Sequence, residues 1–122
     1  MGTFDKIKFV KFGNTVSDIR REFESGETFN SSLSKLYIKY NPGVQNIQKF
    51  IKTAKSIFPS LNCGLTTLYL QNKLGGEIVN GKYKNQNHTF LMIEDTVIDI
   101  TADQYKGPLI YIGPLKQPWT KL

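Results

Sequence analysis

The spacing of the apolar residues changes once along the chain, and this change limits the folds open to it. From about residue 43 to 58, apolar residues recur at steps of three and four, which predicts an amphipathic helix: Val44, Ile47, Phe50, Ile51, Ala54 and Phe58. Asn41-Pro42-Gly43 is a break before this helix, and Pro59 ends it. A second helix is predicted over about 63–74, ended by Gly75-Gly76.

After Gly76 the pattern becomes typical of strands. Four strands are predicted, at 77–83, 88–94, 97–100 and 109–112, with a tight turn at Asp95-Thr96. The tail after Gly113 is interpreted as a loop, with Trp119 available to pack on the rest of the molecule. We therefore expect an α+β fold, in which N-terminal helices pack on an antiparallel sheet of about four or more strands.

The chain of 122 residues has the length of one domain, here 1–122. The segment 43–113 carries the chemistry discussed below. Residues 1–42 are harder to interpret and are expected to contain helix and loop. A helical turn is indicated at 18–23, loops are indicated at 25–27 and 30–32, and 33–38 fits either helix or strand.

The composition indicates a globular chain with dispersed positive charge. Hydrophobic residues make up 39% and charged residues 21%, and the formal net charge is +6. No block of five basic residues occurs, so a solvated basic surface is favoured over a nucleic-acid groove. No apolar run approaches the ~20 residues of a membrane span, and the first residues lack a secretory signal. We expect a protein that acts in the cytoplasm or is delivered into a target cell without a classical signal peptide.

Cys63 is the only cysteine of the chain and His88 is the only histidine. One Cys and one His exclude an internal disulfide and a Cys-rich zinc site, and no cofactor is expected. A cysteine at the first turn of a helix can form a stabilised thiolate, and a nearby histidine strengthens that effect. The pair predicts a cysteine enzyme, although a lone cysteine is more often a small buried hydrophobe.

Asp99 is the preferred third member of the site. It stands in an apolar strand, Val-Ile-Asp-Ile, where a carboxylate is costly to bury unless it is paired. A hairpin that turns at Asp95-Thr96 would place Asp99 near Thr89 or opposite His88. Asp103 lies past the strand and is the rival carboxylate.

Three more residues are candidates for contacts to the oxyanion or the substrate. Asn62 is a good N-cap residue for the helix that begins at Cys63. Gly64 leaves room for a substrate, and the amides of this first turn can bind an oxyanion. Gln104 is a further polar candidate.

These residues resemble the papain-like and transglutaminase-like cysteine superfamily. The resemblance covers about residues 43–113: a helix, Asn-Cys-Gly opening a second helix, a strand led by His, and a following strand that ends Ile-Asp-Ile-Thr. It implies Cys63 as nucleophile, His88 as base and acid, and Asp99 as the residue that orients the ring. The Trp that follows Cys in transglutaminases is absent, and the Gln that precedes Cys in papain relatives has no clear counterpart.

The resemblance implies a thiol-dependent hydrolase or acyltransferase that attacks an amide or ester carbonyl, such as a protease, deamidase or transglutaminase-like enzyme. The chain also resembles bacterial toxin and effector domains of this superfamily. For such a domain the expected partners are a protein or peptide substrate and a cognate inhibitor or immunity protein. The alternative is a basic, non-catalytic binding module for RNA or another anionic partner. An inactive member of the fold, used for protein contacts, is a third hypothesis.

Overall fold

The computed structural model describes residues 6–26, 30–60 and 62–121. Within them, four helices precede a five-stranded antiparallel sheet, which confirms the predicted α+β class. The elements are α1 (Lys6–Ser25), α2 (Asn30–Tyr40), α3 (Ile47–Ser56), α4 (Cys63–Leu74), β1 (Glu77–Tyr83), β2 (Gln86–Ile93), β3 (Thr96–Asp99), the 3-10 helix η1 (Ala102–Tyr105), β4 (Tyr111–Pro114) and β5 (Trp119–Thr120).

The N-terminal part is more helical than the sequence analysis predicts. α1 extends far beyond the predicted turn at 18–23, because Phe12, Val16, Ile19 and Phe23 form one buried stripe at helical spacing. The loop predicted at 30–32 is wrong, since these residues begin α2. Of the other predicted loop, at 25–27, Ser25 is instead the last residue of α1, Gly26 lies in a turn, and Glu27 lies outside the described residues.

Both central helices are present, but α3 is shorter at each end than the predicted 43–58 and ends at Ser56. α3 begins at Ile47, later than expected, because the side chain of Asn46 caps it by accepting a hydrogen bond from the N–H of Lys49 at 3.2 Å. α4 has the predicted bounds. It ends at Gly75, which has a φ of 80° and donates its N–H to the carbonyl of Gln71 at 2.7 Å.

The strand order in the sheet is β4-β3-β2-β1-β5. The predicted turn at Asp95-Thr96 is displaced by one residue, since the turn lies at Glu94 and Asp95, and Glu94 has a φ of 57°. In the resulting register Leu91 pairs with Ile98. Asp99 is therefore level with Phe90, not with Thr89 or His88, and it reaches His88 diagonally along one face of the sheet.

The C-terminal tail is not only a loop, because Trp119 and Thr120 form β5 and pair with Tyr83 and Lys82 of β1. The predicted strand at 109–112 begins later, at Tyr111, and becomes β4. Gly81 allows β5 to approach, since a Cβ added there would lie 2.3 Å from the carbonyl oxygen of Thr120. The tail is thus tied to the hairpin that carries His88.

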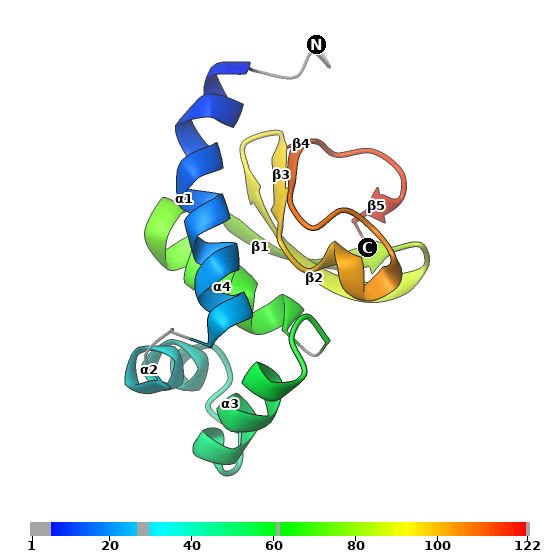
Figure 1. The fold of residues 1–122 in the computed structure, drawn as a ribbon. Coiled ribbons are helices and arrows are strands. Elements are labelled where there is room, and N and C mark those ends of the chain that lie inside the picture. The colour runs from blue at the N-terminus through cyan, green and yellow to red at the C-terminus, as the bar shows by residue number, and fades with distance from the viewer. Residues whose placement is uncertain (1–5, 27–29, 61, 122) are drawn as a thin grey trace.

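α4 contacts α1 and the strands β1 and β2, and α1 also contacts β4. Figure 1 shows α2 and α3 together at one end of the molecule. One apolar cluster joins the helices to the sheet and includes Ile51, Leu65, Leu91 and Ile98. A second cluster covers the other face and contains Val79, Tyr83, Phe90, Met92, Val97, Ala102 and Trp119. Among the described residues, no helix combines the length and apolar character that crossing a membrane requires.

Candidate active site

Cys63 is the first residue of α4, and its side chain is partly exposed. The N–H groups of Cys63 and Gly64 make no hydrogen bond to another described residue, as is usual for a helix's first turn. The hydroxyl of Thr67, one turn later, lies 2.6 Å from the carbonyl oxygen of Cys63 and 3.2 Å from that of Thr89. Thr67 thus ties the start of α4 to strand β2.

Asn62 does not act as the predicted cap. It stands at the N-cap position, but its side chain makes no capping hydrogen bond. Its amide instead donates to the carbonyls of Ala54 at 2.8 Å and Ser60 at 2.7 Å. The residue is fully buried, so it braces the connection between α3 and α4 and has no access to a substrate.

His88 and Asp99 form a buried pair. The distance from His88 Nε2 to Asp99 Oδ2 is 2.7 Å, and each residue is only 2% exposed. Asp99 is the last residue of β3 and is level with Phe90 of β2. His88 is two residues from Phe90 along β2, so His88 and Asp99 are diagonal neighbours on the same face of the sheet. A buried carboxylate is costly unless hydrogen bonds satisfy it, and here the imidazole provides one of them.

Two further groups hold the Asp99 carboxylate. The indole Nε1–H of Trp119 donates to Oδ2 at 2.8 Å. The backbone N–H of Thr101 donates to Oδ1 at 2.9 Å, and the Thr101 hydroxyl donates to the same oxygen at 3.4 Å. Both oxygens are satisfied, so the carboxylate has a fixed orientation toward the ring.

Asp103, the rival carboxylate, serves another partner. Its two oxygens accept hydrogen bonds from Arg20 of α1 at 2.7 and 2.9 Å. Arg20 is 5% exposed and also donates to the carbonyl of Ile100 at 2.7 Å. Asp103 therefore fixes α1 to the segment after β3, and the structure brings Asp99, not Asp103, to His88.

The second nitrogen of His88 faces the cysteine side of the site. Nδ1 is buried without a hydrogen-bond partner among the described residues, and His88 and Cys63 line the same hollow. Burial alone would lower the pKa of His88, but the hydrogen bond to Asp99 and the interaction with Cys63 outweigh it and raise that pKa to about 9.

The thiol titrates in the opposite direction. Burial raises the pKa of Cys63, but the interactions with His88 and with Thr89 outweigh it, so that the pKa is lowered overall. The lowered pKa of Cys63 and the raised pKa of His88 favour a thiolate beside an imidazolium. Such a pair is chemically able to attack a carbonyl carbon.

Aromatic rings restrain the imidazole. Tyr83 and Tyr105 meet it edge to face, at centroid distances of 6.1 and 5.5 Å. Phe90 lies 6.3 Å away, and Trp119 packs on Tyr83 at 4.8 Å. These contacts exclude water from the His88–Asp99 pair and hold the ring in one orientation.

Of the remaining candidates, Gly64 lies at the site and Gln104 does not. Gly64 lines a hollow beside Cys63. Gln104 lines a separate hollow with Lys84, Gln86, Tyr105 and Lys106, which does not include Cys63. Gln104 sits in η1, and its Nε2 is buried without a hydrogen-bond partner among the described residues.

Sequence reasoning misses several residues that the structure brings to the site. Trp119 and Thr101 hold Asp99, and Thr67 and Thr89 hold Cys63. The isolated tryptophan in a polar tail is the one signal that points to an anchoring role. The threonines are too common to stand out before the pairing of β2 with α4 is known.

The same segment of the chain is the part that matches a known family. A family model described as YunG protein matches residues 48–118, more than half of the chain. The chain belongs to the YunG family. The match includes Cys63, His88 and Asp99, and it ends one residue before Trp119.

Comparison with curated proteins gives no match, and comparison with solved structures gives none. The likeness of this YunG-family chain to papain-like and transglutaminase-like enzymes therefore stays a prediction. Among the described residues, no group of three His, Cys, Asp or Glu side chains is arranged to hold a metal ion.

Proposed function

We propose that this YunG-family protein is a thiol-dependent hydrolase or acyltransferase that attacks an amide or ester carbonyl through Cys63, His88 and Asp99. One observation carries the proposal. The single histidine is buried with one ring nitrogen bonded to a fixed carboxylate at 2.7 Å and the other unpaired, in a hollow that it shares with the single cysteine. A histidine that served only packing would gain nothing from this arrangement.

The arrangement supports a two-step reaction. The Cys63 thiolate adds to the carbonyl carbon, and the free N–H of Cys63 is available to the oxygen that becomes negative. His88 then gives its proton to the leaving amine or alcohol, which departs as a thioester forms. Water or an amine next attacks the thioester, His88 takes the proton of this nucleophile, and Cys63 is released as the thiolate.

The outcome depends on the second nucleophile. Water gives proteolysis or deamidation, and an amine gives acyl transfer, as in transglutaminase-like enzymes. The proposed substrate is a protein or peptide, with a cognate inhibitor or immunity protein as a further partner if the chain acts as a toxin or effector. The proposed place of action is the cytoplasm or the interior of a target cell.

The proposal is tested by covalent trapping. An activity probe with a thiol-reactive carbonyl is incubated with the wild-type protein and with Cys63→Ala and His88→Ala, and the adducts are located by mass spectrometry. We expect one adduct, on Cys63, that depends on His88. The free energy of unfolding of Cys63→Ala should differ from that of the wild type by about 1 kcal/mol or less, because the side chain is partly exposed.

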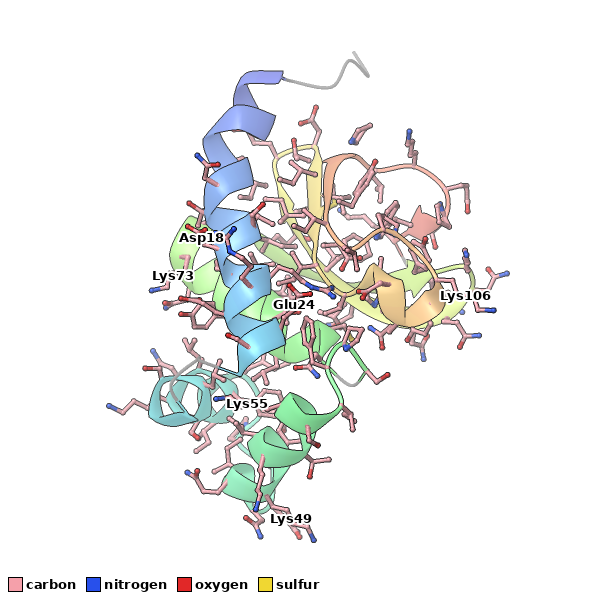
Figure 2. The ribbon with its side chains drawn as sticks, in the orientation of Figure 1. Asp18, Glu24, Lys49, Lys55, Lys73 and Lys106 are labelled. Atoms are coloured by element: carbon pink, nitrogen blue, oxygen red, sulfur yellow. The ribbon has the colours of Figure 1, made fainter. Side chains whose placement is uncertain are left out.

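Labelling no faster than that of a free thiol would contradict the proposal. The alternative hypothesis, a basic binding module, would then take its place. Of the four lysines labelled in Figure 2, Lys73 and Lys106 stand on separate sides of the molecule, whereas Lys49 and Lys55 both belong to α3. A steep dependence of RNA binding on salt would be the signature of this alternative.

A further inference from the structure

Cys63 lies between two hollows of different chemistry. The first, of about 350 Å³, is lined by Cys63, Asn80, Gly81, Asn87, His88 and Thr89 and is called the polar hollow here. The second, of about 290 Å³, is lined by Tyr37, Tyr40, Phe50, Cys63, Gly64, Leu65 and Thr89 and is called the aromatic hollow. Only Cys63 and Thr89 belong to both, so the thiol stands at the boundary. Each volume is near the lower limit for a ligand pocket, which suits one substituent.

The aromatic hollow is built by the helical part of the molecule. Tyr37 of α2 stacks on Phe50 of α3 with ring centroids 4.7 Å apart, and Tyr40 lies 6.2 Å from Tyr37. Leu65 of α4 is buried beneath them, and Gly64 adds no side chain to fill the space. Rings of this kind bind an aromatic or branched apolar group by removing its surface from water.

The polar hollow belongs to the β1–β2 hairpin. Asn80 Oδ1 accepts a hydrogen bond from the Thr89 hydroxyl at 2.9 Å, and the exposed Asn87 follows on the same hairpin. His88 lines this hollow and does not line the aromatic one. The proton donor of the proposed reaction is therefore on one side of the thiol only.

We infer that the aromatic hollow binds the acyl part of the substrate, and that the polar hollow receives the leaving group and then the second nucleophile. The inference rests on the proposed function, because it uses His88 as the proton donor. The leaving amine must meet His88 when the bond to the carbonyl carbon breaks, so it occupies the hollow that His88 lines. The acyl part, on the other side of Cys63, then meets Tyr37, Tyr40 and Phe50.

The substrate class is thus an amide or ester whose acyl part carries an aromatic or large apolar group and whose leaving group is polar. In the first step the Cys63 S–C bond forms, the C–N or C–O bond breaks, and the proton of His88 goes to the departing group. In the second step water supplies the oxygen, its proton returns to His88, and the S–C bond breaks. No oxidant or reductant is needed.

The test compares two chloromethyl ketones that differ only in the acyl part: 1-chloro-4-phenylbutan-2-one, which has a phenyl group, and chloroacetone, which has none. Rates of Cys63 alkylation are measured by mass spectrometry and divided by the iodoacetamide rate of the same variant. We expect the wild-type protein to prefer the phenyl probe by about tenfold or more, after correction for the ratio shown by a free thiol.

Gly64→Leu supplies the decisive variant, with Gly64→Ala as its matched control. A Cβ at Gly64 meets nothing within 4 Å, so both variants are expected to fold, which thermal unfolding checks. Leucine extends into the aromatic hollow and should bring the ratio close to that of a free thiol, whereas alanine should keep most of the preference.

The possible failures are distinguishable. If iodoacetamide and both ketones react with Cys63 no faster than with a free thiol, the proposed function fails. If Cys63 is activated but the wild-type protein has no preference, or Gly64→Leu keeps it, the assignment of the aromatic hollow is overturned and the proposed function stands.

Discussion

The ionisation of Cys63 and His88 decides the pH range in which the site can work. The pKa of Cys63 is lowered and that of His88 is raised to about 9. Activity should therefore rise with pH as the thiol loses its proton, and should fall near pH 9 as the imidazolium loses the proton needed by the leaving group. The pH dependence of kcat/KM, measured on an amide substrate, should give a bell with its upper limb near 9.

The pH dependence of Cys63 alkylation should be simpler than that of kcat/KM, because it reports the thiol alone. Alkylation by iodoacetamide requires the thiolate and no proton donor, so the lowered pKa of Cys63 should let it begin at a lower pH than for a free cysteine, whose pKa is ~8.5. In His88→Ala the inflection should move upward, because the interaction with Thr89 remains but that with His88 is lost. An unchanged inflection in His88→Ala would show that the ring does not act on the thiol.

The two aspartates should respond differently to the same substitution. Asp99→Asn is expected to reduce turnover about 10–100-fold, less than His88→Ala, because the carboxylate orients and charges the ring but does not move the proton. Asp103→Asn leaves the buried Arg20 with a weaker partner, and should cost about 1–3 kcal/mol of unfolding free energy with little effect on thiol alkylation. Turnover and urea unfolding are measured for both. A silent Asp99→Asn beside an inactive Asp103→Asn would move the proposed role to Asp103.

Trp119 supports Asp99 through one N–H group. Trp119→Phe keeps an aromatic ring but removes the donor to a buried carboxylate, so a loss of about 2–3 kcal/mol in unfolding free energy and a fall in turnover are expected. Tyr111→Phe is the matched control. Its ring stacks on Trp119 with centroids 3.9 Å apart, but its hydroxyl donates to the carbonyl of Pro114 and not to Asp99. Equal effects on turnover in the two variants would contradict this role of the indole.

At the scale of elements, the site depends on how α4 lies against β2. Thr67→Val keeps the shape of the side chain but removes the hydroxyl that links the carbonyls of Cys63 and Thr89. We expect a loss of about 1 kcal/mol and slower alkylation of Cys63, because the thiol is no longer held beside the hairpin. Thermal unfolding measures the loss of stability, and mass spectrometry of samples quenched at successive times measures the alkylation rate of Cys63.

Thr66→Val is the control for this link. The Thr66 hydroxyl contacts only carbonyls at the helix start, those of Asn62 at 2.8 Å and Cys63 at 3.3 Å, and does not reach the sheet. The substitution should lower stability by a similar amount and leave the alkylation rate closer to that of the wild type. The reverse order of the two rates would show that the link between α4 and β2 does not position the thiol.

Element bounds were predictable where a local signal fixes them. Gly75-Gly76 ends α4 and precedes β1, and both elements have the predicted bounds. The β2–β3 turn was misplaced by one residue, because Glu94 adopts a positive φ that neither its residue type nor its neighbours indicate. The observed turn makes Asp99 level with Phe90, whereas a turn at Asp95-Thr96 would make it level with Met92. Neither register gives the predicted Thr89 or His88.

For the whole molecule, the sequence predicted the order of helices before strands and singled out Cys63, His88 and Asp99, but not the residues that surround them. Cys63, His88 and Asp99 stand out because each is rare or costly in its context. The support from Arg20 and Trp119 depends on contacts between residues about 80 and 20 positions apart along the chain. Such contacts follow from the packing of α1 and β5, which no local pattern reveals.

The place of β5 also has a consequence for protein synthesis. Cys63 leaves the ribosome fifty-six residues before Trp119, which corresponds to about 3–11 s at ordinary rates of elongation. Until Trp119 pairs with β1, Asp99 lacks one of its donors, and His88 is not yet enclosed. Until Trp119 has been translated and β5 has paired with β1, the nascent chain therefore carries a cysteine whose proposed partners are not yet fully assembled.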